Sequence, residues 1–310
     1  MSTKSPTPSG ASTVSSYVVI SPLRNEEAYL PLTIASMCAQ TVKPLQWVLV
    51  DDGSTDRTAA LVDEAAALHP WISAVHRRDR GFRQAGGGVI DAFYEGWSHL
   101  RDAGWDVVVK LDGDLSFGPD YFERCLLRLR QDPTLGIVGG TCCLPGDGPP
   151  RPEFDGEPPF HVRGPTKIYR RTCLEAIGGL IRAPGWDTAD QMKANMLGWA
   201  TRTFADIEIV HHRPTGSAYG AWSNWTKNGM ANFVTGYDPL FMACKCVKRL
   251  LSRPGRAGLV EAAGLASGYL KGYWKAVPRV EDRALIAYVR AQQRRTLLLR
   301  RSLWRHPERR

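Results

Sequence analysis

Short apolar runs rich in β-branched residues alternate with longer amphipathic segments over the first 111 residues of the chain. The short runs predict strands, over residues 17–20, 46–50, 72–75 and 106–111. The segments between them have apolar residues at helical spacing, over residues 26–40, 55–68 and 89–100. This alternation predicts an α/β fold with a mostly parallel sheet flanked by helices. In such sheets, ligands bind at the carboxyl ends of the strands.

The pattern changes in the second half of the chain. Residues 145–159 are dense in Pro and Gly and predict a long loop or lid. Residues 203–210 predict a strand, and beyond about residue 235 the chain shows aromatic, Gly-containing and basic helical segments. We therefore expect a disordered N-terminus over residues 1–16, an α/β domain over 17–235 and a helical basic extension over 236–310.

The composition of the chain indicates its class, and the distribution of its charges indicates a type of partner. The 310 residues are 43% hydrophobic and 23% charged, which is typical of globular proteins. No apolar run is long enough to predict a transmembrane helix, and the seven scattered cysteines form no CxxC framework, so a reducing cytoplasm is expected. Residues 241–310 hold 17 Lys and Arg against 4 Asp and Glu. Such asymmetry indicates an anionic surface partner.

Two carboxylates follow the strand predicted over residues 106–111. Asp112 and Asp114 are separated by one Gly, and side chains at i and i+2 of an extended segment share a face. Such a pair can bind Mg²⁺ or Mn²⁺, which prefer oxygen ligands and keep positions open for phosphates. The simpler alternative is a strand followed by an Asp-Gly turn.

A second acidic turn follows the strand over residues 46–50. It reads Asp51-Asp52-Gly53-Ser54-Thr55-Asp56 and leads into a predicted helix. A carboxylate there can accept hydrogen bonds from a nucleobase N–H or a ribose hydroxyl. Helix capping by Asp56 would account for the same pattern.

Taken together, these motifs resemble those of family 2 glycosyltransferases, which have the GT-A fold. The resemblance covers roughly residues 17–220 and is carried by Ser21-Pro22-Leu23-Arg24-Asn25-Glu26-Glu27, by Val50 to Asp56, by Asp112-Gly113-Asp114, and by the region of Gly185-Trp186-Asp187. It implies an inverting transfer of a sugar from a nucleotide-diphospho-sugar, with a divalent cation, Mg²⁺ or Mn²⁺, as cofactor.

The resemblance also assigns roles to residues. Asp112 matches a position that contacts ribose and metal, and Asp114 matches the direct metal ligand. The donor-binding residues that it implies are Ser21, Asn25, Glu27, Asp52, Arg80, Arg83 and Asp112. Guanidinium groups suit a diphosphate, although Arg80 and Arg83 would also be ordinary as solvated surface charges.

Inverting transfer needs a base that deprotonates the acceptor hydroxyl. In the family, an Asp ahead of a helix lies about eleven residues before a Gly-aromatic pair, and Gly198-Trp199 places Asp187 at that spacing. Asp190 stays an alternative, because Trp186 replaces the usual Glu, and both residues could simply flank the helix. His211, at a strand end, is a candidate third metal ligand, although a lone His is often structural.

The basic extension bears on the acceptor and the place of action. Tyr269, Tyr273 and Trp274 stand among lysines, a combination that suits a membrane–water interface. We expect a cytoplasmic enzyme, peripheral on the inner face of the membrane, with a lipid-linked or saccharide acceptor in cell-surface polysaccharide or glycolipid assembly. Helices packed on the catalytic domain are the alternative. No nucleic-acid recognition module is visible.

Two other functions fit parts of the pattern. A sugar nucleotidyltransferase would use a similar sheet, but it needs a Gly-rich basic loop after the first strand, where residues 21–27 are acidic instead. A catalytically inactive binding or scaffold protein would show no metal-dependent nucleotide binding.

Overall fold

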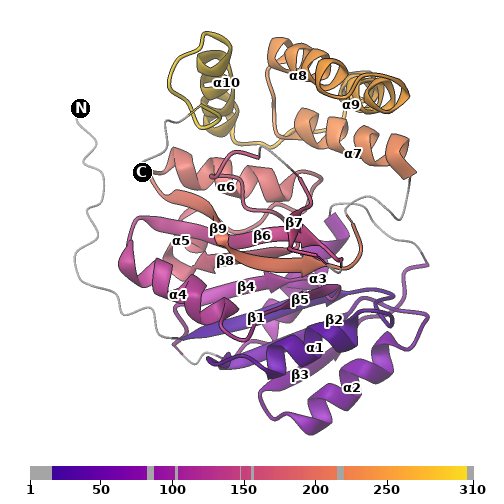
Figure 1. Ribbon diagram of the computed structural model, residues 1–310, viewed down its shortest axis with the longest axis vertical. Coiled ribbons are helices and arrows are strands. Elements are labelled where there is room, and N and C mark those ends of the chain that lie inside the picture. Colours follow the sequence, from indigo (N-terminus) through magenta and orange to yellow (C-terminus); the bar gives the residue numbers. More distant parts are fainter. Residues whose placement is uncertain are drawn as a thin grey trace. The chain divides into compact units, whose positions relative to one another are not determined.

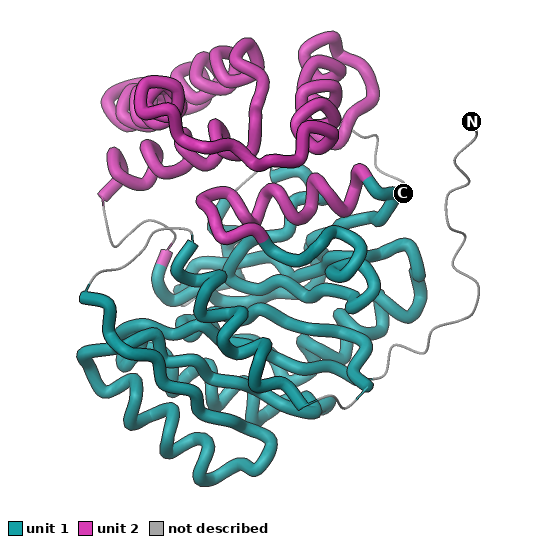
Figure 2. The backbone as a smooth tube through the Cα atoms, turned by 180° about the vertical axis from the view of Figure 1, so that it is seen from behind, with its two compact units in different colours: residues 1–180, 197–213 teal, residues 181–196, 214–310 magenta. Residues whose placement is uncertain are grey.

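The computed structural model describes residues 16–81, 87–101, 104–146, 148–154, 157–214 and 220–305. The chain divides into two compact units (Figure 2). The first comprises residues 1–180 and 197–213, and the second comprises residues 181–196 and 214–310. None of the helices in the described ranges has the length and apolar character needed to cross a membrane.

The first unit contains a mixed α/β sheet domain (Figure 1). Its strands are β1 (Tyr17–Leu23), β2 (Gln46–Asp51), β3 (Ile72–His76), β4 (Val107–Leu111), β5 (Leu115–Phe117), β6 (Leu135–Leu144), β7 (Arg151–Pro152), β8 (Thr166–Arg170) and β9 (Ala200–His211). Its helices are α1 (Leu30–Cys38), α2 (Thr58–Leu68), α3 (Gly87–Ser98), α4 (Tyr121–Gln131) and α5 (Arg171–Ala176).

The described strands form one sheet in the order β3-β2-β1-β4-β8-β6-β9-β5, with β7 paired to β6. β1 pairs in parallel with β2 and β4, and β2 pairs in parallel with β3. β8 joins β4 and β6 antiparallel, β6 and β9 run parallel, and β5 is antiparallel to β9. The parallel half therefore brings the carboxyl ends of β1, β2 and β4 to one edge.

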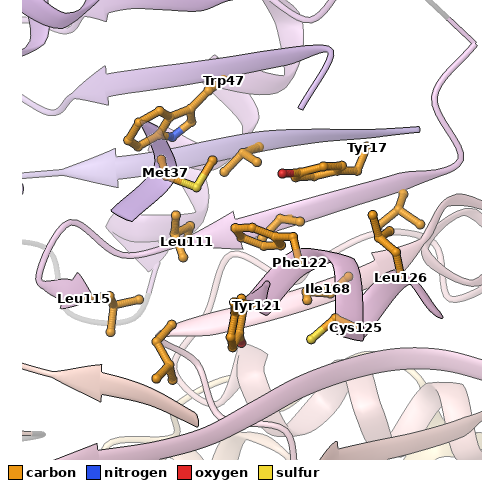
Figure 3. Close-up of a cluster of buried hydrophobic side chains, with 14 of the residues drawn as sticks. Tyr17, Met37, Trp47, Leu111, Leu115, Tyr121, Phe122, Cys125, Leu126 and Ile168 are labelled. Carbon is orange, nitrogen blue, oxygen red and sulfur yellow. The ribbon is translucent and has the colours of Figure 1, made fainter. Parts of the chain in front are cut away.

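Both faces of the parallel strands are buried, which explains why these strands are almost continuously apolar. Alternate residues such as Tyr17, Val19 and Trp47 enter a core shared with α1, α2 and α4 (Figure 3). The intervening residues point to the opposite face, where α3 approaches so closely that a Cβ at Gly96 would lie 2.6 Å from Ile20.

The second unit is helical. It contains α6 (Trp186–Met196), α7 (Gly220–Val234), α8 (Pro239–Ser252), α9 (Arg256–Trp274) and α10 (Arg283–Leu297). α7 and α8 both pack against α9, and α10 packs against α6 and α8. Asp238 caps α8 by accepting a hydrogen bond from the backbone N–H of Leu240, and Arg294 of α10 donates to the same carboxylate at 2.8 Å.

Most predicted elements are confirmed within a few residues, including the five predicted strands and the α/β class. The sequence did not predict the strands β5, β6, β7 and β8 or the helices α4, α5 and α7, and β7 lies within the segment 145–159 that was predicted to be a loop. The compact units also divide elsewhere than at residue 235, because α6 and α7 cluster with the C-terminal helices. Residues 1–15, within the segment expected to be disordered, lie outside the described residues.

Candidate active site

The turns after β1 and β2 hold each other in place at the edge of the sheet. Asn25 adopts a positive φ of 57°, and its side-chain oxygen accepts a hydrogen bond from the backbone N–H of Thr55 at 2.9 Å. The carboxylate of Glu27 accepts from the backbone N–H of Arg57 at 3.0 Å. Both predicted donor-binding residues therefore brace the acidic turn in this structure, and their contact with a donor stays a prediction.

Ser21 lies in the core of the first unit. Its side chain is fully buried, and its hydroxyl accepts a hydrogen bond from the indole N–H of Trp47 at 2.9 Å. A buried indole N–H without an acceptor would be costly. Ser21 thus has a structural role that the sequence did not indicate, and its predicted role in binding a nucleobase is untested.

Asp52 is buried at the end of β2 and lies between two guanidinium groups. Arg77 donates to its Oδ1 at 2.6 Å, and Arg80 donates to its Oδ2 at 2.5 Å. Arg80 was predicted from the sequence, whereas Arg77 was missed, although it stands in a basic run directly after β3. Arg83 lies outside the described residues.

The carboxylates of Asp112 and Asp114 have different surroundings. Lys110, buried in β4, bonds the Asp112 carboxylate and donates to the carbonyl of Gly164 at 2.8 Å. Burial raises the pKa of Asp112; the ammonium group of Lys110 opposes this effect and the Asp114 carboxylate reinforces it. Gly113 between them approaches Leu23 so closely that a Cβ would lie 2.5 Å from its side chain.

Asp114 is 7% exposed, and its Oδ1 receives no hydrogen bond from any described residue. The nearest cationic atoms are the Nε2 of His211 at 3.6 Å from Oδ1 and the Nε of Arg213 at 3.8 Å from Oδ2. The backbone N–H of His212 donates to the Asp114 carbonyl at 2.9 Å, which fixes the end of β9 beside this carboxylate. A buried carboxylate oxygen without a partner is a position that a cation can occupy.

His211 connects Asp114 to a carboxylate that the sequence reading did not single out. Its Nδ1 lies 3.1 Å from Oε2 of Glu153, which is on the loop between β7 and β8. Burial acts to lower the pKa of His211, but the carboxylates of Asp114 and Glu153 outweigh it and raise the pKa to about 9. With this pKa the ring is protonated at neutral pH, so a cation would bind Nε2 only by displacing its proton. A carboxylate on the other imidazole nitrogen is the usual arrangement of metal-binding histidines.

These side chains fit a divalent cation that shares its coordination with a substrate. No group of three or more His, Cys, Asp or Glu side chains in the described ranges is arranged to hold a metal by itself. Mg²⁺ and Mn²⁺ are commonly held by one or two protein ligands together with substrate phosphates. Asp114, whose Oδ1 accepts no hydrogen bond from the described residues, and His211 beside it would supply those ligands. Asp112, which is bonded by Lys110, stays a predicted ligand as well.

Arg213 adds a cation at this edge. Its guanidinium bonds both carboxylate oxygens of Glu26, 187 residues earlier in the chain. His212 is engaged differently, with its Nε2 2.7 Å from the hydroxyl of Ser116 and its ring stacked on Tyr29. Arg213 follows the predicted ligand His211 by two residues, but the sequence did not indicate a role for it.

The two candidate bases lie on α6, in the second unit. Asp187 is half-buried in the first turn of the helix, and Asp190 is 4% exposed. The carboxylate of Asp187 acts with burial to raise the pKa of Tyr237, and one carboxylate oxygen of Asp190 accepts from the backbone N–H of Gln191 at 2.6 Å. Asp187 is therefore the more exposed of the two carboxylates, and the role of either as the base stays a prediction.

Solved structures share this fold. The mannosyltransferase PcManGT from Pyrobaculum calidifontis, in complex with GDP-Man and Mn²⁺, matches with a TM-score of 0.54 and 20% identity over 87% of this chain and 78% of its own. S. aureus TarS 1-349 matches with a TM-score of 0.51 and 16% identity over 88% of this chain and 78% of that one. The predicted GT-A fold is thereby confirmed.

Curated relatives match a shorter region. The undecaprenyl-phosphate mannosyltransferase of Micrococcus luteus is 31% identical over 42% of this chain and 49% of its own length. The polyprenol monophosphomannose synthase of Mycolicibacterium smegmatis is 32% identical over 42% of this chain and 46% of its own. The match thus spans about half of each relative. The model of glycosyl transferase family 2 matches residues 18–177, and the chain therefore belongs to family 2 of the glycosyltransferases.

Proposed function

We propose that this glycosyltransferase moves a sugar, with inversion, from a nucleotide-diphospho-sugar to a lipid-linked or saccharide acceptor in cell-surface glycan or glycolipid assembly. The observation that carries the proposal is the buried Asp114, whose Oδ1 receives no hydrogen bond from the described residues and lies 3.6 Å from His211. A bound Mg²⁺ or Mn²⁺ supplies charge that stabilises the departing diphosphate. The names of the relatives support the class of reaction.

Different side chains at this edge of the sheet would bind different parts of the donor. Asp52 offers carboxylate oxygens to the nucleoside and shares them with Arg77 and Arg80. Lys110 fixes Asp112 by an ion pair, so that its second oxygen is left for the ribose. Arg213, near Asp114, can exchange its contact for a diphosphate oxygen, because guanidinium groups bind phosphate with paired hydrogen bonds.

A base on α6 completes the proposed reaction. Asp187 takes the proton of the acceptor hydroxyl, which attacks the anomeric carbon from the side opposite the departing diphosphate, and Asp190 is the alternative base. General-base catalysis of this kind contributes roughly 10²–10⁴-fold to a rate. The half-buried state of Asp187 supports its choice.

We further propose that transfer occurs at the inner face of a membrane. The M. luteus relative is named for undecaprenyl-phosphate and the M. smegmatis relative for a polyprenol, which are lipids. An acceptor of that class would bring the enzyme to a membrane surface from the cytoplasm.

A thermal-shift comparison of UDP-, GDP- and dTDP-sugars, each with and without Mn²⁺, tests the donor site. One nucleotide class should raise the Tm, and only when Mn²⁺ is present, because a ligand at 100 times its Kd stabilises a protein by about 2.7 kcal/mol. Asp114→Asn should abolish that shift while leaving the Tm of the free protein nearly unchanged. The exposed Asp120 provides the matched control, as Asp120→Asn. If the nucleotide-sugar raises the Tm equally with and without Mn²⁺, and does so in Asp114→Asn as well, the proposed donor site is wrong.

A further inference from the structure

Helix α9 has its small residues inside and its large apolar residues outside. Its packed side carries Gly264, Gly268 and Gly272, where added Cβ atoms would lie 1.9–2.8 Å from atoms of α7. Its solvent side carries Leu259, Leu270 and Trp274, which are 60%, 62% and 87% exposed. In a water-soluble helix the large apolar residues face the core. Small residues between helices and large ones outside are typical of helices that meet lipid.

Helix α8 also presents large apolar residues to solvent. Leu240, Val247 and Leu251 follow one another at helical spacing, and they are 62%, 54% and 78% exposed. The opposite side of α8 carries the buried Met242 and Arg249, which reaches Glu261 of α9 at 3.5 Å. The apolar stripe therefore points away from the packed helices. We call these six exposed residues of α8 and α9 the apolar stripes.

Basic residues flank the apolar stripes. Within α8, described throughout, three residues are cationic and none is acidic. Lys248 directly follows Val247, Lys271 follows Leu270, and Lys275 follows Trp274, so each lies beside a stripe around the helix. The acid of α9, Glu261, is buried and paired with Arg249 and Arg253. The charge presented to a partner next to the stripes is therefore positive.

We propose that the α8–α9 face of the second unit docks on an anionic lipid surface. The apolar stripes enter the boundary between headgroups and acyl chains, Trp274 lies at the level of the headgroups, and Lys248, Lys271 and Lys275 contact the phosphates. Amphipathic helices with apolar and basic faces bind membranes in this way, and Trp and Lys suit the interface. Since it specifies the surface used, this inference rests on the proposed action at a membrane, although not on the transfer reaction itself.

Vesicle co-sedimentation of the whole protein tests the docking face. The protein should bind vesicles of phosphatidylcholine and phosphatidylglycerol in equal parts, and bind pure phosphatidylcholine more weakly. Leu251→Ser with Trp274→Ala should lower binding at least about tenfold, because each removes exposed apolar surface that the lipid would bury. Lys248→Gln should lower binding about fivefold on the anionic vesicles alone.

Matched variants in the first unit provide the controls. Leu68 is 75% exposed, close to the 78% of Leu251, and Leu68→Ser should leave vesicle binding unchanged. Arg130→Gln is the corresponding control for Lys248→Gln, and it should also leave vesicle binding unchanged. The docking face would be wrong if Leu68→Ser lowered vesicle binding as much as the α8–α9 variants do, or if the protein bound anionic and neutral vesicles equally well. So would a vesicle-free dimer that Leu251→Ser dissociates without any change in lipid binding.

The thermal shift with donor and Mn²⁺ separates the two proposals. The docking variants should keep the full donor-dependent shift, because the substituted side chains lie on α8 and α9. If the protein binds vesicles but no donor raises its Tm, the transferase proposal is refuted and the docking face is supported. If a donor with Mn²⁺ raises the Tm but the protein does not bind vesicles, the docking face is refuted and the donor site is supported.

Discussion

Removing the carboxylate of Glu153 tests the arrangement of the metal side of the site. Glu153→Ala takes away the acceptor that lies 3.1 Å from Nδ1 of His211. The imidazole then loses the contact that orients the ring and aims Nε2 toward Asp114. Removing the hydrogen-bond partner of a metal-binding histidine typically weakens metal binding 10–100-fold, which corresponds to about 1.4–2.7 kcal/mol of binding free energy.

Calorimetric titration of Mn²⁺ into the protein with the nucleoside diphosphate bound measures this loss directly. Glu153→Gln, which keeps an acceptor but not the charge, should fall between the wild type and Glu153→Ala. Glu157 provides the control, because it lies on the same loop and pairs with Arg163 at 3.9 Å and His161 at 4.0 Å. Glu157→Ala should leave the Mn²⁺ affinity unchanged.

The result that refutes this reasoning is a Mn²⁺ Kd for Glu153→Ala within about twofold of the wild type, measured on a folded variant. A loss as large in Glu157→Ala would equally refute it, since the effect would then belong to the charge of the loop and not to the contact with His211. Circular dichroism and the Tm of both variants establish that the fold is intact.

Three further predictions concern other parts of the chain. Asp187→Asn should retain the donor-dependent thermal shift and lower kcat by roughly 10²–10⁴-fold; unchanged turnover, with loss in Asp190→Asn instead, would move the base. Ser21→Ala should lower the free energy of unfolding by about 1–3 kcal/mol in urea, because the indole N–H of Trp47 loses its buried acceptor, and no change would contradict that role. Asp238 caps α8; burial acts to raise its pKa, but hydrogen bonds from an arginine and backbone N–H groups hold it below its usual value. The stabilisation of the fold by the Asp238 carboxylate should therefore be complete above about pH 4 and be lost as the pH falls through the lowered pKa. Asp238→Ala should cost about 0.5–2 kcal/mol of unfolding free energy at neutral pH and progressively less as the pH falls below about 4.

The site was predictable where a motif and a strand end coincide. Asp52, Asp112 and Asp114 directly follow predicted strands, and the parallel pairing of β1 with β2 and β4 makes those ends neighbours. Parallel pairing follows from the alternation of strands and helices, so the acidic turns could be grouped without a structure. The family resemblance then supplied their roles, which stay predictions for each residue.

Contacts between distant segments were not predictable. Glu153 stands in a loop rich in Pro and Gly, and its link to His211 joins positions 58 residues apart. Glu26 and Arg213 are 187 residues apart, and although Glu26 belongs to the motif after the first strand, nothing in the sequence pairs it with Arg213. β6 was missed because Gly139 and Gly140 interrupt its apolar run, although each fits a position where neighbouring atoms leave no room for a Cβ.

The sequence by itself determined the α/β class, the strand ends that carry acidic residues and the basic character of the C-terminal helices, because periodicity, turn chemistry and charge are local properties. Tertiary structure decided the rest. Ser21 became a partner of Trp47, Asp114 became a buried carboxylate beside His211 with one oxygen that accepts no hydrogen bond from the described residues, and large apolar residues of α9 were left facing outward. Burial and pairing depend on which distant segments pack together, and a sequence pattern does not specify that packing.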